Sequence, residues 1–381
     1  MNLKIWLFRH IPLFRRIGSL KVAPAVINEN RQMRKAFDCY DDGDIPPMLN
    51  GETKTVFKTA FAKFNWQQHR QMHLWREFLG CDISLVKKAN RKLPAPNSPI
   101  VICVIKNDMA RLPVLLDHYR KIGIQRFAFM DNGSTDGTFE LLHEQPDVDL
   151  WLSRKPYTTD RREAWITRLL AHYGFDRWYL CVDSDELFVY FDCETTSIDK
   201  FVMSCECRNE RRVRSLMLDM YCDKPMPLDD DGEDIRRTYC YFDTNTYTTT
   251  AKEKLDEVRG GPRSRILSHG DAAKFLLTKY PLFKFMQGDI QGFSHFQFPY
   301  DENYGLECRS ALLHYKFLAN DMEKYIQRAQ QGNYASGSLE YKEYAQRLGD
   351  GKKISFFDPT FSKPYKSSES LRQIKELAGW R

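Results

Sequence analysis

The chain has 381 residues, and its 57 lysines and arginines against 51 aspartates and glutamates give a formal net charge of +6. Hydrophobic residues make up 42% and aromatic residues 13% of the chain, so it can bury a large core and is not mainly disordered. The charge excess is small and the charged residues are interspersed. This excludes the class of nucleic-acid binders that depend on a concentrated basic stripe.

Residues 1–95 are predicted to form a helical N-terminal region that ends at the proline-rich segment 93–99. The segment from Ile5 to Arg16 mixes apolar and basic residues, and it is not typical of a secretion signal because arginines interrupt its apolar stretch. Two interpretations stay open for it: peripheral contact with an anionic membrane surface, or a helix that packs on its own domain. The ten cysteines include no C-x-x-C pair, and no apolar run approaches the ~20 residues that span a bilayer. We therefore expect a cytoplasmic protein with reduced thiols.

Strands and helices are predicted to alternate after this boundary. Apolar runs predict strands at 100–105, 126–130, 149–152 and 178–182, and helical spacing predicts helices at 112–122, 137–143 and 163–173. This alternation is typical of an α/β fold with a doubly wound, mainly parallel sheet. We expect this domain to cover residues 96–320, followed by a helical C-terminal extension over residues 321–381.

The sequence Asp183-Ser184-Asp185-Glu186 directly follows the apolar run 178–182. Residues i and i+2 of an extended chain point to the same side, so Asp183 and Asp185 are expected to converge. Two converging carboxylates repel each other unless a cation compensates them, and oxygen ligands of this kind suit Mg²⁺ or Mn²⁺. The alternative is an acidic turn whose side chains cap the next element.

Two more polar segments follow predicted strands. Lys106-Asn107-Asp108 comes after the first strand, and the sequence from Asp131 to Thr138, DNGSTDGT, comes after the second. Because parallel strands end at one edge of a sheet, all three polar segments are expected to meet there, where such folds bind ligands.

These three segments, in this order and spacing, resemble the GT-A glycosyltransferases, and specifically the family-2-like group related to family 92, with bacterial-type members. That group pairs (K/R)-N-(E/D), D-N-G-S-T-D-G-T and D-x-D-E motifs after its first, second and fourth strands. The resemblance is strong over residues 98–195 and weaker to about residue 320. It implies a GT-A fold. The segment around His314, Leu-Leu-His-Tyr-Lys, also resembles the strand that closes the catalytic domain in this group.

The resemblance implies roles for individual residues. Asp185, His314 and Asp183 are expected to hold a divalent cation, Mn²⁺ or Mg²⁺, with the imidazole favouring Mn²⁺. The expected donor-binding residues are Asn107, Asp108, Asp131, Asp183, Arg263 and Lys279. The alternative interpretation of Arg263 and Lys279 is that they belong to a solvated basic face of the protein.

The implied activity is transfer of a sugar from a nucleoside diphosphate sugar, UDP-linked, to a hydroxyl of a glycan or lipid-linked acceptor, with inversion. Inversion needs a general base, and only Asp289 and Glu302 emerge as candidates, both weak. The cellular role expected from the resemblance is polysaccharide biosynthesis at the inner membrane face. The alternative is a non-catalytic sugar-nucleotide-binding or scaffold protein on the same fold. A dinucleotide-dependent oxidoreductase is disfavoured, because no G-x-G-x-x-G follows the first strand.

Overall fold

The structure is a computed structural model, and it describes Leu74, Glu77, Phe78 and residues 80–377 with short gaps. The gaps are residues 231, 233, 253–254, 269–274, 287–288, 299, 304, 320, 332–340 and 347–352. The segment Ile5–Arg16, for which we predicted membrane contact or helix packing, lies outside the described residues, as does most of the predicted N-terminal region.

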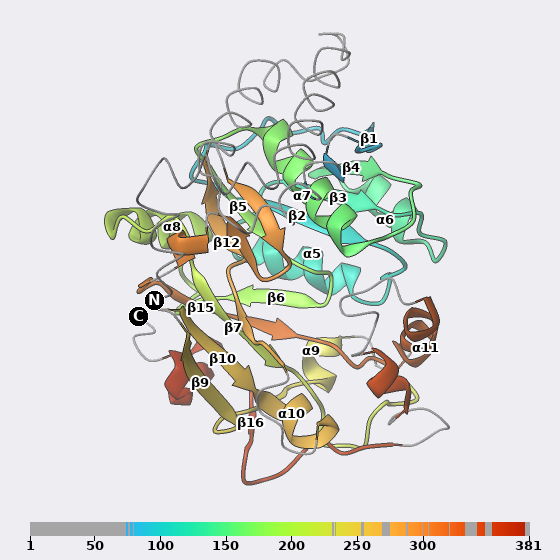
Figure 1. The fold of residues 1–381 in the computed structure, drawn as a ribbon, viewed down its shortest axis with the longest axis vertical. Coiled ribbons are helices and arrows are strands. Elements are labelled where there is room, and N and C mark those ends of the chain that lie inside the picture. The colour runs from blue at the N-terminus through green and yellow to red at the C-terminus, as the bar shows by residue number, and fades with distance from the viewer. Residues whose placement is uncertain are drawn as a thin grey trace, which may run out of the picture.

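A six-stranded main sheet dominates the upper half of Figure 1. In spatial order its strands are β1 (Ser84–Lys87), β4 (Val148–Leu152), β3 (Phe127–Asp131), β2 (Ile100–Ile105), β5 (Arg177–Cys181) and β12 (Leu282–Phe285). The four central strands pair in parallel, whereas the edge strands β1 and β12 are antiparallel to their neighbours. The α/β class with a mainly parallel central sheet is thereby confirmed.

Both faces of the main sheet are buried, and this explains the unbroken apolar run of β2. Val101 and Cys103 join one core, which includes α5 (Leu112–Lys121) and α8 (Ile198–Cys207). Ile100 and Ile102 join a second core, which includes α7 (Thr159–Tyr173). A strand covered on both faces has no need of polar alternation.

A four-stranded second sheet lies below the main sheet in Figure 1. Its order is β11 (Thr278–Lys279), β7 (Arg214–Asp219), β15 (Arg309–His314) and β6 (Glu186–Val189), with β7 and β15 parallel. The chain leaves the main sheet at Cys181 and enters the second sheet at Glu186. Residues 182–185 therefore connect the two sheets, and they carry the acidic motif.

The remaining elements surround the two sheets. Three antiparallel pairs are β9 (Tyr247–Lys252) with β10 (Leu255–Gly260), β13 (Ile290–Phe293) with β14 (Phe296–Phe298), and β16 (Ser362–Pro364) with β8 (Tyr241–Asp243). Further helices are α6 (Thr138–Glu144), α9 (Ile235–Thr238), α10 (Gly261–Leu267) and α11 (Asp321–Gln331), with 3-10 turns η1 (Tyr300–Asn303), η2 (Ser368–Gln373) and η3 (Lys375–Leu377).

The two terminal regions differ in part from the helical additions predicted for them. Residues 84–87, within the predicted N-terminal region, form β1 and extend the main sheet. The C-terminal region contains α11, but it also contributes β16, and η2 and η3 near its end are 3-10 turns. Extended segments of this kind take their structure from the strands that they pair with, so local sequence pattern does not reveal them.

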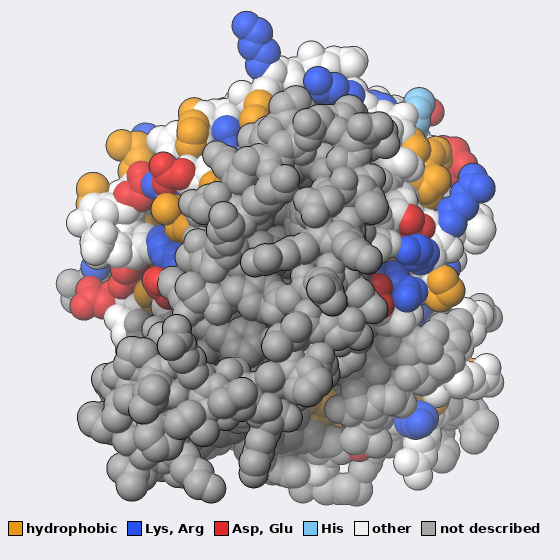
Figure 2. All heavy atoms as spheres, turned by 45° about the horizontal axis from the view of Figure 1, so that its top comes forward, with side chains coloured by type: hydrophobic (Ala, Val, Ile, Leu, Met, Phe, Trp, Pro, Cys, Tyr) orange, Lys and Arg blue, Asp and Glu red, His pale blue; other side chains and the backbone are white. Residues whose placement is uncertain are grey.

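The described surface carries charges of both signs. Figure 2 shows Lys and Arg side chains interspersed with Asp and Glu side chains along the two sides of the visible face. All the described cysteines are free. Within the described residues, no helix combines the length and apolar character needed to cross a bilayer.

Candidate functional site

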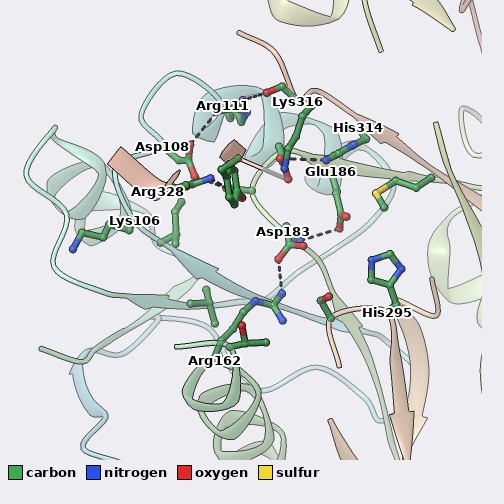
Figure 3. A pocket seen from close by; sticks show the side chains of 18 of the residues that line it. Lys106, Asp108, Arg111, Arg162, Asp183, Glu186, His295, His314, Lys316 and Arg328 are labelled. Atoms are coloured by element: carbon green, nitrogen blue, oxygen red, sulfur yellow. Dashed lines mark hydrogen bonds and ion pairs between the residues drawn. The ribbon is translucent and has the colours of Figure 1, made fainter. Parts of the chain in front are cut away.

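A pocket of about 360 Å³ lies at the carboxyl ends of β2, β3 and β5, where the main sheet meets the second sheet (Figure 3). The loops after these strands supply Lys106, Asp108, Asn132 and the acidic motif, and β11 and β15 supply Lys279 and His314. The expected meeting of polar segments at one edge of the sheet is thus observed. The volume is in the range of small-molecule sites.

Asp183, Asp185 and Glu186 gather their carboxylates on one wall of the pocket. One oxygen from each lies within 4.8 Å of the others. Two side chains help to fix this loop: the Asp183 amide donates to Glu186 Oε2 over 3.0 Å, and Ser184 Oγ donates to Asp108 Oδ2 over 2.6 Å. The second bond ties the acidic loop to the loop after β2.

Two buried cations compensate this cluster. Lys279 Nζ lies 2.9 Å from Asp183 Oδ2 and 2.7 Å from Glu186 Oε2, and Arg162 of α7 pairs with the other oxygen of Asp183. Burial favours the neutral carboxyl of Asp183, but Arg162 and Lys279 hold its pKa well below the usual range. Burial raises the pKa of Glu186, although Lys279 opposes this shift. The ammonium of Lys279 therefore forms ion pairs with two carboxylates, those of Asp183 and Glu186.

His314 stands beside the acidic cluster at the end of β15. Its Nε2 lies 3.3 Å from Asp185 Oδ2, and its Nδ1 donates to Asp219 Oδ1 over 2.6 Å. Burial disfavours the charged imidazolium, yet the carboxylates of Asp185 and Asp219 raise the pKa of His314 above its ordinary value. An imidazole held by a carboxylate on one nitrogen presents the other nitrogen in a fixed direction, which is how proteins orient histidine ligands of metals.

These side chains form a donor set that fits a divalent cation. Carboxylate oxygens of Asp183, Asp185 and Glu186 converge, and the imidazole of His314 adjoins Asp185. Oxygen donors suit both Mg²⁺ and Mn²⁺, and a nitrogen donor favours Mn²⁺. Two of the predicted ligands, Asp183 and Asp185, lie within this carboxylate group, and the third, His314, contacts Asp185 alone of the three carboxylates. Their roles as ligands stay predictions.

Asn107 and Asp131 shape the edge of the pocket without lining it. Asp131 is fully buried, and its Oδ1 accepts hydrogen bonds from the amides of Gly133 and Ser134 over 2.8 and 2.9 Å. Asn107 adopts a positive φ of 54°, and its Oδ1 accepts from the Thr135 amide over 2.7 Å. Asp131 thus closes the turn after β3, and Asn107 holds this turn against the loop after β2. The donor-binding roles of both residues stay predictions.

Arg263 lines the pocket, but its guanidinium is engaged by protein groups. Its Nε donates to Asp219 Oδ2 over 2.8 Å, it lies over the ring of Phe275 at 4.9 Å, and it contacts the Tyr344 hydroxyl. Asp219 is the carboxylate that holds His314. In this structure Arg263 supports the histidine, and the diphosphate clamp that we expected of it is a prediction.

Asp289 and Glu302, the two base candidates, do not line the pocket. Both pair with Arg211, whose Nη1 lies 2.5 Å from Asp289 Oδ2 and whose Nη2 lies 2.9 Å from Glu302 Oε1. Asp289 is 3% exposed. Arg211 also contacts the Lys284 carbonyl of β12, so both carboxylates belong to an ion cluster beside this strand. The base roles that we predicted for them are not supported by their position.

Sequence reasoning missed the wall that the C-terminal region contributes. Tyr325 and Arg328 of α11 line the pocket together with Tyr341 and Lys316. Lys316 Nζ and the guanidinium of Arg328 each lie 5.3 Å from the centre of the Tyr341 ring. The i, i+3 spacing of Tyr325 and Arg328 on one helix face was the signal available for this wall.

A buried ion network fixes α11 to the pocket. Arg111 Nη1 lies 3.0 Å from Asp108 Oδ1 and 3.1 Å from Asp321 Oδ1, and Lys324 Nζ lies 3.1 Å from Asp108 Oδ1. Arg111 also donates to the Tyr315 carbonyl, one residue after His314. The loop after β2, the end of β15 and the start of α11 are thus joined through one guanidinium.

Comparisons with known proteins give little direct evidence of function. No family model matches the chain, and a search of curated proteins finds no significant match, so the resemblance to the family-2-like group stays a prediction. Among solved structures, the chain is similar to a mannosyltransferase from Pyrobaculum calidifontis in complex with GDP-Man and Mn²⁺, with 17% identity and a TM-score of 0.24. That match covers 43% of this chain and 46% of the mannosyltransferase, less than half of its length.

The second neighbour is a UDP-glucose pyrophosphorylase complexed with UDP-glucose, with 10% identity and a TM-score of 0.24. This match covers 74% of the present chain and 99% of the other. With TM-scores this low, we base the function on the geometry of the pocket itself.

Proposed function

We propose that this protein is a metal-dependent glycosyltransferase that moves a sugar from a nucleoside diphosphate sugar to an acceptor hydroxyl. The observation that carries the proposal is the convergence of Asp183, Asp185 and Glu186 beside His314, on the wall of a pocket at the carboxyl edge of a parallel sheet. Such an edge is where α/β folds bind nucleotides. The sequence resemblance supports the same conclusion.

The pocket offers groups for each part of the donor. Asp185 and His314, with Asp183, would hold Mn²⁺ or Mg²⁺, which when bound neutralises charge that develops on the departing diphosphate. Lys279 and Arg162 lie on the same wall and add positive charge there. Asp108 and Asn132, from the loops after β2 and β3, lie at the end of the pocket proposed for the nucleoside.

The acceptor side is assigned to the wall formed by Lys316, Tyr325, Arg328 and Tyr341. Aromatic rings stack on sugar rings, and cations beside them suit an acceptor that carries phosphate or carboxylate. A glycan or lipid-linked acceptor fits this chemistry. We propose inversion, a UDP-linked donor, a role in polysaccharide biosynthesis and peripheral membrane contact through the N-terminal region, all on the basis of the sequence resemblance.

The test is a screen of UDP- and GDP-hexoses for release of nucleoside diphosphate, with Mn²⁺ and with excess chelator. We expect hydrolysis of at least one donor with Mn²⁺ alone, and its loss in Asp185→Asn. Asp229→Asn is the matched control, because Asp229 is 92% exposed and pairs with Lys353 on the surface. Metal-dependent nucleotide binding without turnover of any donor would favour a non-catalytic binding protein. No binding at all would refute both.

A further inference from the structure

His295 is a pocket residue that neither the sequence motifs nor the cation site uses. It lies in the turn between β13 and β14, and its partly exposed imidazole lines the pocket. Figure 3 shows it rising from this hairpin toward the side of the pocket where Asp183 and Glu186 lie. It therefore borders the space that a substrate would fill.

One hydrogen bond fixes which ring nitrogen carries the proton. His295 Nδ1 lies 2.8 Å from the carbonyl oxygen of Thr278. A carbonyl oxygen only accepts, so Nδ1 carries the hydrogen and Nε2 of the neutral ring carries the lone pair. Within the described part of the chain, Nε2 makes no hydrogen bond. It is therefore a proton acceptor without a partner among the described residues, on a ring that the Thr278 carbonyl holds in place.

The surroundings keep this imidazole neutral. Burial and the nearby ammonium of Lys279 lower the pKa of His295 to about 4; the Thr278 carbonyl and Asp183 oppose this shift, and Arg263 adds to it. These charged groups come from β11, the acidic loop and α10, the elements that face the ring. At neutral pH the lone pair on Nε2 is available.

The carboxylates in the pocket are less available than His295 as proton acceptors. Asp108, Glu163, Asp183, Glu186 and Asp321 each pair with a lysine or an arginine, and Asp185 pairs with His314 in the proposed cation site. To take a proton, any of them would first have to weaken a buried ion pair, which is unfavourable. His295 needs no such rearrangement.

We propose that His295 is the general base of the transfer, an inference that rests on the function proposed above. As the acceptor oxygen forms its bond to the anomeric carbon, His295 Nε2 takes the hydroxyl proton. The bond from the anomeric carbon to the diphosphate oxygen breaks, and the diphosphate leaves with the electron pair. The imidazolium then returns its proton to solvent.

The test compares His295→Gln with wild type on the donor that the screen identifies, with water as the acceptor. The glutamine amide can still donate to the Thr278 carbonyl, but it cannot take a proton. We expect kcat to fall by about 10²–10⁴-fold, while calorimetry shows the Kd for the nucleoside diphosphate with Mn²⁺ unchanged within about twofold. His143→Gln is the control, because His143 is exposed on α6, and it should keep wild-type kcat.

A pH profile separates a base from a merely structural residue. Above pH 6 the wild-type kcat should be flat, whereas the residual rate of His295→Gln should rise about tenfold per pH unit, because hydroxide must replace the base. If the variant unfolds, His295→Asn repeats the comparison. A variant within threefold of wild-type kcat, or one with the wild-type pH profile, would overturn this assignment and leave the proposed function standing. A wild-type protein that turns over no donor would overturn both.

Discussion

Replacing Lys279 by methionine tests whether one buried ammonium stabilises the acidic cluster. The side chain of Lys279 is 2% exposed and that of Glu186 is 1% exposed, and Nζ contacts both Glu186 and Asp183. Methionine keeps the apolar stem but leaves these carboxylates without their shared cation. Removing one partner of a buried pair costs about 3–5 kcal/mol of unfolding free energy. At about 2 °C per kcal/mol for a domain of this size, Tm in chelator should fall by about 6–10 °C.

The same variant reports on the cation site. The acidic cluster of Lys279→Met is more negative, so it should bind Mn²⁺ more tightly than the wild-type cluster. Each tenfold gain in affinity adds about 1.4 kcal/mol at a fixed excess of cation, or about 3 °C in Tm. Differential scanning fluorimetry with and without Mn²⁺ measures both effects. Lys200→Met is the surface control and should change stability by less than about 0.5 kcal/mol.

Two results would refute this reasoning. A Tm of Lys279→Met within 1 °C of wild type in chelator would mean that the ion pairs contribute nothing to stability. An equal gain in Tm with Mn²⁺ in both proteins would mean that Lys279 and the metal do not compensate the same carboxylates.

Three further predictions address other parts of the molecule. Asp185→Asn should keep the wild-type Tm within about 3 °C in chelator and lose at least 100-fold of metal-dependent donor turnover; normal turnover would place the site elsewhere. Burial lowers the pKa of His118 to about 4. The contribution of its neutral ring to the free energy of unfolding is therefore complete above pH 6.5 and is lost as the pH falls toward 4. The stability difference between wild type and His118→Gln, measured by urea unfolding, should therefore shrink by about 3 kcal/mol between pH 7 and pH 4; a constant difference would contradict this. Gly260→Ala should lower Tm clearly, because Gly260 has a φ of +113° and an added Cβ would collide with the Thr246 carbonyl. An unchanged Tm would contradict this backbone conformation of Gly260 and its close approach to Thr246.

The central sheet was predictable because its signals are local. The run Ile100–Ile105 forms β2 with the bounds that we predicted, since β-branched residues between two buried faces leave few alternatives. The turn after β3 and the acidic loop after β5 followed from the same pattern. Their meeting at one edge needed only the rule that parallel strands end together.

Most of the pocket's chemistry depends on contacts between distant segments. The pairing of Lys279 with Glu186, nearly a hundred residues earlier in the chain, arises because β11 joins β7 in the second sheet. A basic residue in a short strand gives no local sign of such a partner. His295 likewise depends on distant segments for its role as a proton acceptor. The Thr278 carbonyl fixes its Nδ1, and the carboxylates around it are paired with cations. The base candidates Asp289 and Glu302 were chosen by residue type alone, and Arg211 holds both outside the pocket.

The most direct test of the central claim is electron spin echo spectroscopy of Mn²⁺ bound to the protein with UDP. If Asp185 and His314 hold the cation, the wild-type spectrum shows modulation from a directly coordinated ¹⁴N nucleus, and His314→Gln loses it. A wild-type spectrum without that nitrogen coupling, or a coupling that persists in His314→Gln, would contradict the account.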